Sequence, residues 1–152
     1  MKKIVLSISM LLLIIVANAQ QNKAEIAEKL KAIEAAWNNS GMDKDHGVAY
    51  KTKIIAEDFY QLGDNGKVEN KAAAINKQVV SKETITSINN GPMVVHFYGT
   101  NVATVIGSHI EKGNDKDGKP FTRQYGWADT FMERNGNWQC IGSGSTEIKK
   151  DK

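Results

Sequence analysis

One segment of the chain, residues 121–133, alternates ionisable and aromatic side chains with small or polar ones. If this segment is a β-strand, every second side chain points to the same face, so rings and charges share one side. A carboxylate among rings loses hydration, and its pKa then rises, which suits a general acid or base. Asp129 is therefore the candidate acid–base residue, and the alternative is a hydrated Asp129 at a rim or paired with a cation. The residues of this face are Phe121, Arg123, Tyr125, Trp127, Asp129, Phe131 and Glu133.

Three tyrosines could offer a phenol to a ligand oxygen, namely Tyr60, Tyr98 and Tyr125. We assign Tyr60 as a candidate catalytic residue that would stabilise charge while Asp129 moves a proton. The alternative is that each phenol only satisfies its own hydroxyl group in a core. Trp37 would form an aromatic floor of the same pocket.

His96 alternates with Val94 and Tyr98, so we expect it to reach the pocket, and His109 could lie across from it on the following strand. Arg123 shares the face of Asp129, but six residues of strand span roughly 20 Å, so the two cannot be direct partners. The expected pocket residues are Trp37, His96, Tyr98, Arg123, Tyr125 and Trp127.

Metal and cofactor motifs are not recognisable in this sequence. The histidines His46, His96 and His109 show none of the spacings of a metal site. Residues 113–118 resemble a calcium loop only in part, because glycine and glutamine stand where the first and last ligands belong. Neither a phosphate loop nor a dinucleotide-binding glycine pattern is present. We expect no metal and no cofactor.

The elements that must position these residues follow from periodicity. An apolar stripe at Ile26, Leu30, Ile33 and Trp37 predicts a helix over 23–38. Asn135-Gly136 predicts a tight hairpin. Helices come first and hairpins follow, which indicates an α+β fold with helices on one face of a bent sheet. Further helices are expected at 46–56 and 71–80, and strands at 59–62, from Val68, and at 84–88, 93–98, 102–111, 121–133 and 138–147.

The N-terminal segment has the three parts of a secretory signal peptide. Lys2 and Lys3 precede the apolar residues 4–16, and Ala17-Asn18-Ala19 is a small-x-small cleavage site. The apolar run is shorter than the roughly 20 residues of a membrane-spanning helix. We expect cleavage after Ala19, export to the periplasm or beyond, and no membrane attachment afterwards.

The rest of the chain, residues 20–152, is expected to be one domain with an ordered core at about 23–148. Removing Lys2 and Lys3 lowers the formal charge from +3 to +1. No basic stripe remains, which argues against a nucleic-acid partner. Cys140 is the sole cysteine, and its strand-like surroundings beside Trp138 predict burial.

Several short motifs, taken in order, resemble one family. They are Ile33-Glu34-Ala35-Ala36-Trp37, Ala56-Glu57-Asp58-Phe59, Gly66-Lys67-Val68 with Lys71, and Met132-Glu133-Arg134-Asn135-Gly136-Asn137-Trp138. Together they resemble the SnoaL-like, ketosteroid-isomerase-like group with the nuclear-transport-factor-2-like fold, and most closely its exported members classed as domain of unknown function 4440. The resemblance implies a cone in which a curved sheet wraps a long helix and leaves a pocket.

Three functions are compatible with that resemblance, since one scaffold commonly hosts unrelated functions. The first is an exported module that binds a small apolar or semi-polar molecule. The second is a cofactor-free isomerase, dehydratase or hydrolase with Asp129 as base. The third is a structural module that forms a homodimer through its sheet. A cavity with a buried acid would favour the second reading, a cavity of rings and hydroxyls the first, and a filled interior the third.

Overall fold

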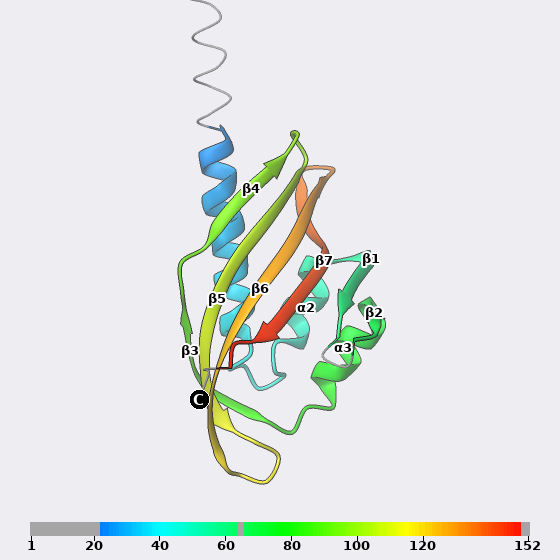
Figure 1. The fold of residues 1–152 in the computed structure, drawn as a ribbon. Coiled ribbons are helices and arrows are strands. Elements are labelled where there is room, and N and C mark those ends of the chain that lie inside the picture. Colours follow the sequence, from blue (N-terminus) through cyan, green and yellow to red (C-terminus); the bar gives the residue numbers. More distant parts are fainter. Residues whose placement is uncertain (1–21, 64–65, 150–152) are drawn as a thin grey trace, which may run out of the picture.

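The computed structural model describes residues 22–63 and 66–149. Helices cover one face of a curved, mainly antiparallel sheet, and the long N-terminal helix runs behind the strands (Figure 1). This confirms the α+β architecture. The expected signal segment, residues 1–19, lies outside the described residues. In the described part of the chain, no helix has the length and apolar character needed to cross a membrane.

The N-terminal helix, whose described part is residues 22–40, packs its predicted apolar stripe against the core. Leu30 is fully buried, and Ile26, Ile33 and Trp37 are half-buried beside it. At the end of the helix, the Ser40 hydroxyl donates to the Trp37 carbonyl at 2.7 Å. The stripe therefore fixes which side of this helix faces the sheet.

Two short helices close the same face, α2 (Val48–Ile54) and α3 (Lys71–Val79). The Asp45 carboxylate accepts backbone hydrogen bonds at the start of α2, and Asn70 accepts one from Ala73 at the start of α3. The predicted extension of α2 to residue 56 is wrong. Strand β1 already begins at Ile55, because that residue pairs with Cys140 of β7.

The sheet has the order β2-β1-β7-β6-β5-β3, with β4 also paired to β5. Only β1 and β7 run parallel, and the other pairs are antiparallel. Asn135 and Gly136 both have positive φ, which confirms the predicted hairpin. The strands are β1 (Ile55–Leu62), β2 (Val68–Asn70), β3 (Thr84–Asn90), β4 (Val94–Tyr98), β5 (Val102–Asn114), β6 (Pro120–Arg134) and β7 (Asn137–Glu147).

Strand β6 has the predicted phase over its central part. Trp127, Asp129 and Phe131 are all buried. The fully buried Cys140 lies opposite Phe131 on β7, which confirms its predicted burial. The core thus lies between β6, β7 and the N-terminal helix.

Strand β4 has the opposite phase to the one expected. Val95 and Phe97 pack against the core, whereas His96 is exposed and Tyr98 is 60% exposed. Directly opposed residues share a face, and Val95 is opposite the fully buried Val105. His109, which could have lain across from His96 in another register, does not, because His96 lies opposite Thr104.

Candidate functional site

Two buried carboxyl groups meet at the centre of the domain. Glu34, on the N-terminal helix, is 1% exposed, and Asp129, on β6, is 5% exposed. A second negative charge beside the first would be costly at this depth, which favours a proton on one of the two groups. Burial raises both pKa values, to about 6 for Asp129 and well above the usual range for Glu34. The pair therefore shares one proton near neutral pH.

The surroundings make Asp129 the member of the pair that ionises first. The Ser143 hydroxyl donates to its carboxylate, and the nearby positive charge of Lys51 also counteracts the effect of burial on its pKa. The negative charge of Asp129 raises the pKa of Glu34 further, so that Glu34 keeps the proton. Each carboxyl still has one oxygen without a hydrogen-bond partner among the described residues, Glu34 Oε1 and Asp129 Oδ1.

Asp129 lies in the wall of an open cavity of about 290 Å³. Trp37 and Trp127 supply aromatic surface, and Lys51 and Ser143 supply polar groups. The Trp127 indole nitrogen is also buried without a partner in the described part of the chain. The complete lining is Trp37, Asn38, Lys51, Gln61, Leu62, Lys77, Gln78, His109, Tyr125, Trp127, Asp129, Ser143 and Ser145.

A second cavity of about 290 Å³ adjoins the first. His109 and Tyr125 line both spaces, and their rings pack at a centroid distance of 5.4 Å. Burial lowers the pKa of His109, and its Nδ1 has no partner among the described residues. The residues common to both cavities are Trp37, Asn38, Gln78, His109, Tyr125 and Ser145.

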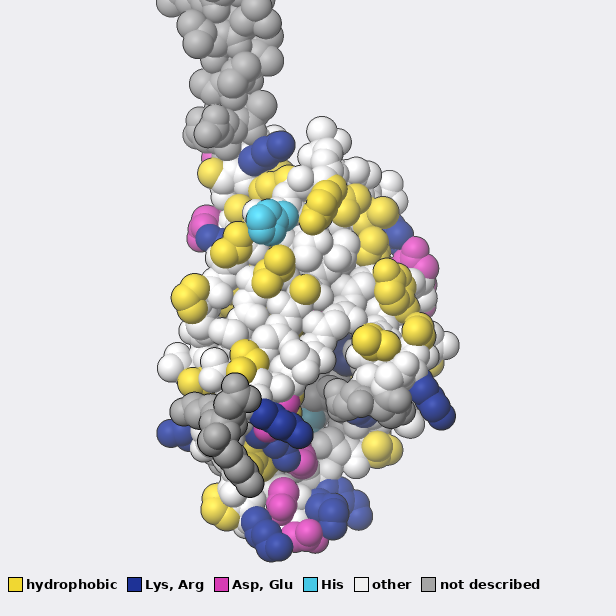
Figure 2. Space-filling model, in the orientation of Figure 1, with side chains coloured by type: hydrophobic (Ala, Val, Ile, Leu, Met, Phe, Trp, Pro, Cys, Tyr) yellow, Lys and Arg dark blue, Asp and Glu magenta, His cyan; other side chains and the backbone are white. Residues whose placement is uncertain are grey.

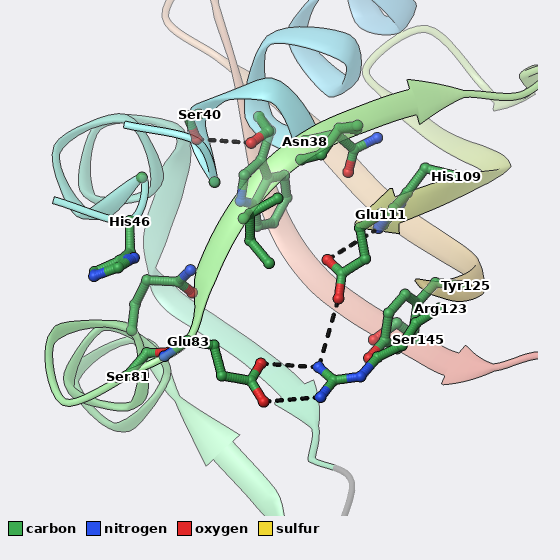
Figure 3. Close-up of a pocket in the computed structure, with 16 residues that line it drawn as sticks. Asn38, Ser40, His46, Ser81, Glu83, His109, Glu111, Arg123, Tyr125 and Ser145 are labelled. Atoms are coloured by element: carbon green, nitrogen blue, oxygen red, sulfur yellow. Dashed lines mark hydrogen bonds and ion pairs between the residues drawn. The ribbon is translucent and has the colours of Figure 1, made fainter. Parts of the chain in front are cut away.

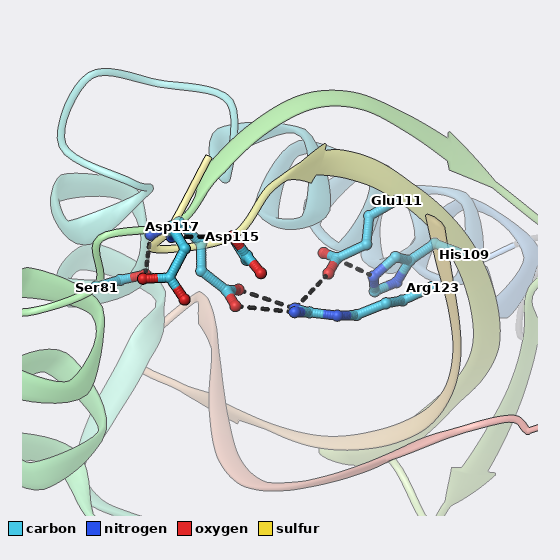
Figure 4. A network of polar contacts seen from close by, with 7 residues as sticks. Ser81, His109, Glu111, Asp115, Asp117 and Arg123 are labelled. Atoms are coloured by element: carbon cyan, nitrogen blue, oxygen red, sulfur yellow. Dashed lines mark hydrogen bonds and ion pairs between the residues drawn. The ribbon is translucent and has the colours of Figure 1, made fainter. Parts of the chain in front are cut away.

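An ion-pair network lines the second cavity, as Figures 3 and 4 show. The Arg123 guanidinium donates to both Glu83 oxygens at 2.8 Å and lies 3.6 Å from Glu111. Glu111 Oε2 is 4.0 Å from His109 Nε2. Arg123 lowers the pKa of Glu83, whereas burial raises the pKa of Glu111. The charged side chains at this end of the site therefore form ion pairs with one another.

The structure brings together most of the residues expected to form the site. Trp37, Tyr125 and Trp127 surround the cavity that contains Asp129. Arg123 lies in the adjoining cavity, on the same strand face as expected. The described residues contain no cluster of three or more acidic, histidine or cysteine side chains that could hold a metal.

Three of the expected residues lie elsewhere. Tyr60 is 59% exposed and lines a separate hollow beside β2 and α3, away from Asp129. His96 and Tyr98 lie on the outer face of β4 and line neither cavity. Sequence reasoning missed Glu34 and Lys51, which the structure places at the centre.

Solved structures share this architecture along almost their whole length. An NTF2-like protein from Cytophaga hutchinsonii superposes with a TM-score of 0.67 at 13% identity, covering 80% of this chain and 97% of that one. The chain has the NTF2-like fold. The association domain of C. elegans CaMKII superposes at 0.66 with 15% identity, covering 82% and 96%.

A third similar structure is an enzyme. The hexachlorocyclohexane dehydrochlorinase LinA type 2 superposes with a TM-score of 0.69 at 11% identity, covering 87% of this chain and 90% of that one. At such identities the likeness concerns the fold alone. No protein-family model and no curated protein sequence matches the chain. Assignment to the exported group of unknown function 4440 therefore stays a prediction.

Proposed function

We propose that the protein binds a small, semi-apolar organic molecule in the cavity beside Asp129. The observation that carries this proposal is Asp129, a buried carboxylate that lines an open cavity and has one oxygen, Oδ1, without a partner among the described residues. A buried polar atom without a partner costs about 1–3 kcal/mol. A ligand that donates a hydrogen bond to Asp129 recovers that cost.

The rest of the lining suits a ligand with an apolar body and one polar end. Trp37, Tyr125 and Trp127 offer ring surfaces, and Lys51 and Ser143 stand on the polar side near Asp129. Ligand sites commonly combine aromatic walls with a few placed polar groups. The similar fold of a dehydrochlorinase supports small-molecule use of this scaffold.

Native mass spectrometry of the protein purified from its own source tests this proposal. We expect a retained ligand on the unmodified protein and its loss from Asp129→Asn. Asp117→Asn is the matched control, because Asp117 is exposed on the loop between β5 and β6 and lines neither cavity. Equal ligand retention in all three proteins, or none in any of them, would overturn the proposal.

A cofactor-free enzyme is the second candidate, and the buried acid Asp129 in the cavity wall, the feature expected for this function, favours it. A base with a pKa of about 6 is ionised at neutral pH yet still basic enough to accept a proton in a reaction. Tyr125, which lines both cavities, would replace Tyr60 as the polar stabiliser. The test is whether a retained ligand is converted by the unmodified protein and left unchanged by Asp129→Asn.

The outer face of β4 and β5 supports an additional proposal, that two copies associate through the sheet. Val94 and Ile106 lie directly opposite each other and are 54% and 45% exposed. Figure 2 shows hydrophobic side chains gathered over this part of the molecule. We expect light scattering to give a dimer mass, and Ile106→Lys to give a monomer. A monomer at all concentrations would contradict this.

A further inference from the structure

Lys51 is a buried lysine whose amine has only uncharged hydrogen-bond partners in the described part of the chain. The residue is 7% exposed. Its Nζ lies 3.4 Å from the Ala74 carbonyl and 3.5 Å from Gln61 Oε1. Both distances exceed the 2.7–2.9 Å or so of strong charge-assisted hydrogen bonds. The Trp37 ring, 5.9 Å from Nζ, adds a cation–π contact at the limit of its range. The ammonium form is therefore poorly solvated.

The charges around Lys51 have opposing effects on the pKa of its amine. Burial lowers the pKa of its amine most, and the like charge of Lys77, from α3, lowers it further. Smaller opposing effects come from Asp129 on β6, Glu69 on β2 and Cys140 on β7, and the pKa remains below its usual value. A desolvated lysine beside another cation holds more of its neutral, nucleophilic form at neutral pH.

We propose that Lys51 is a covalent capture site, at which its amine forms an imine with a small aldehyde or ketone in the cavity. The inference rests on the proposed ligand site and names the class of its ligand, a carbonyl compound with an apolar ring or chain. Lys51 and Asp129 line the same cavity, so a nucleophile and a proton-carrying group face one bound molecule. The rings of Trp37 and Trp127 would hold its apolar part.

The reaction uses only groups that are present. The neutral Nζ attacks the carbonyl carbon, and one of the two nitrogen protons passes to the carbonyl oxygen to give a carbinolamine. The minor fraction of Asp129 that is protonated at neutral pH supplies a proton to the leaving hydroxyl, which departs as water. The nitrogen lone pair closes the C=N bond, and the carboxylate recovers a proton from nitrogen. One amine and one carbonyl therefore give one imine and one water, without redox change.

Reductive trapping tests the proposal directly. The folded protein is treated with benzaldehyde and sodium cyanoborohydride at neutral pH, and the sites of benzylation are mapped by peptide mass spectrometry. Lys53, exposed two residues away on the same helix, is the internal control. We expect Lys51 to be labelled faster than Lys53, since the lowered pKa of its amine leaves more of the neutral, nucleophilic form. Labelling of Lys51 no faster than Lys53 would overturn the proposal.

Two further measurements make the outcome specific. Lys51→Arg keeps the positive charge but removes the nucleophile, so the fast adduct should vanish while Lys53 is still labelled slowly. Benzyl alcohol has the same ring without a carbonyl group, and its binding is followed by tryptophan fluorescence. If it binds while Lys51 stays unlabelled, imine formation fails and the ligand site stands. If neither occurs, both proposals fail.

Discussion

At the scale of single residues, the chemistry of this protein depends on two carboxyl groups that cannot both be charged at low cost. Glu34 and Asp129 are buried against each other, and a second negative charge would add repulsion to lost hydration. Ser143 and Lys51 lower the cost of ionising Asp129 only. Because of this asymmetry, Asp129 is a hydrogen-bond acceptor that lines the cavity, and Glu34 beside it is a protonated hydrogen-bond donor.

This pair predicts a pH-dependent stability. The folded protein binds protons more tightly than the unfolded chain between about pH 4 and 7, so the contribution of the pair to the free energy of unfolding falls as pH rises through that window. Glu34→Gln removes one charge. We measure the free energy of unfolding of both proteins by urea denaturation at pH 4 and pH 8. The difference between the variant and the unmodified protein should shift in favour of the variant by on the order of 1–3 kcal/mol from pH 4 to pH 8.

Glu28→Gln is the matched control, because Glu28 is exposed on the same helix and pairs with Lys31. The difference in free energy of unfolding between this control and the unmodified protein should change by less than about 0.5 kcal/mol over the same pH range. The lowered pKa of His109 acts in the opposite direction but is common to all three proteins, so it cancels in the differences. Identical pH dependence for both variants would refute the shared proton.

Alternation along β6 was sufficient to place Asp129 on the same face as the rings, but it left open whether the carboxylate is buried or hydrated, and the structure shows it buried. Glu34 carried a signal that was not used. It lies four residues after Leu30 and three before Trp37, so it belongs to the apolar stripe of its helix. A charged residue inside such a stripe indicates a buried polar group with a partner. The partner itself, on β6, depends on tertiary packing.

At the scale of elements, the N-terminal helix holds one wall of the cavity through its apolar stripe. Leu30 is fully buried, and truncating a buried leucine costs about 2–5 kcal/mol. We expect Leu30→Ala to lose that amount in equilibrium denaturation. Lys29→Ala, on the exposed side of the same turn, should change stability by less than about 0.5 kcal/mol. A loss of less than about 0.5 kcal/mol for Leu30→Ala would mean that the apolar stripe does not face the sheet.

Strands β1 and β4 show where local patterns are insufficient. Strand β4 has apolar residues on both faces, Val94 and Tyr98 on one and Val95 and Phe97 on the other, so alternation could not decide its phase. Its pairing with β5 decides it. The start of β1 at Ile55 similarly depends on parallel pairing with β7, which lies far along the sequence.

At the scale of the whole molecule, the NTF2-like cone leaves an interior that its residues do not fill. Two adjoining cavities lie between the helices and the inner face of the sheet, one holding Asp129 and the other the Arg123 network. A purely structural module would gain stability from filling that space. The open interior therefore supports ligand binding as the proposed role of the domain.

Export is a separate proposal about the whole chain. Lys2 and Lys3, the apolar residues 4–16 and Ala17-Asn18-Ala19 motivate it. The intact mass of the protein recovered from its source should correspond to a chain that starts at Gln20, with or without cyclisation of that glutamine. A mature protein that still carries Lys2 and Lys3 would contradict export with cleavage.

The most direct test of the central claim is the titration of the Asp129 carboxyl carbon by NMR. An exposed aspartate titrates near its usual value of about 3.9. We predict that Asp129 titrates near pH 6, because burial of the carboxylate disfavours its charge. We also predict that a bound ligand, donating to the ionised carboxylate, lowers that value. A pKa at or below about 3.9 in the ligand-free protein would contradict the account, since Asp129 would then be hydrated or paired.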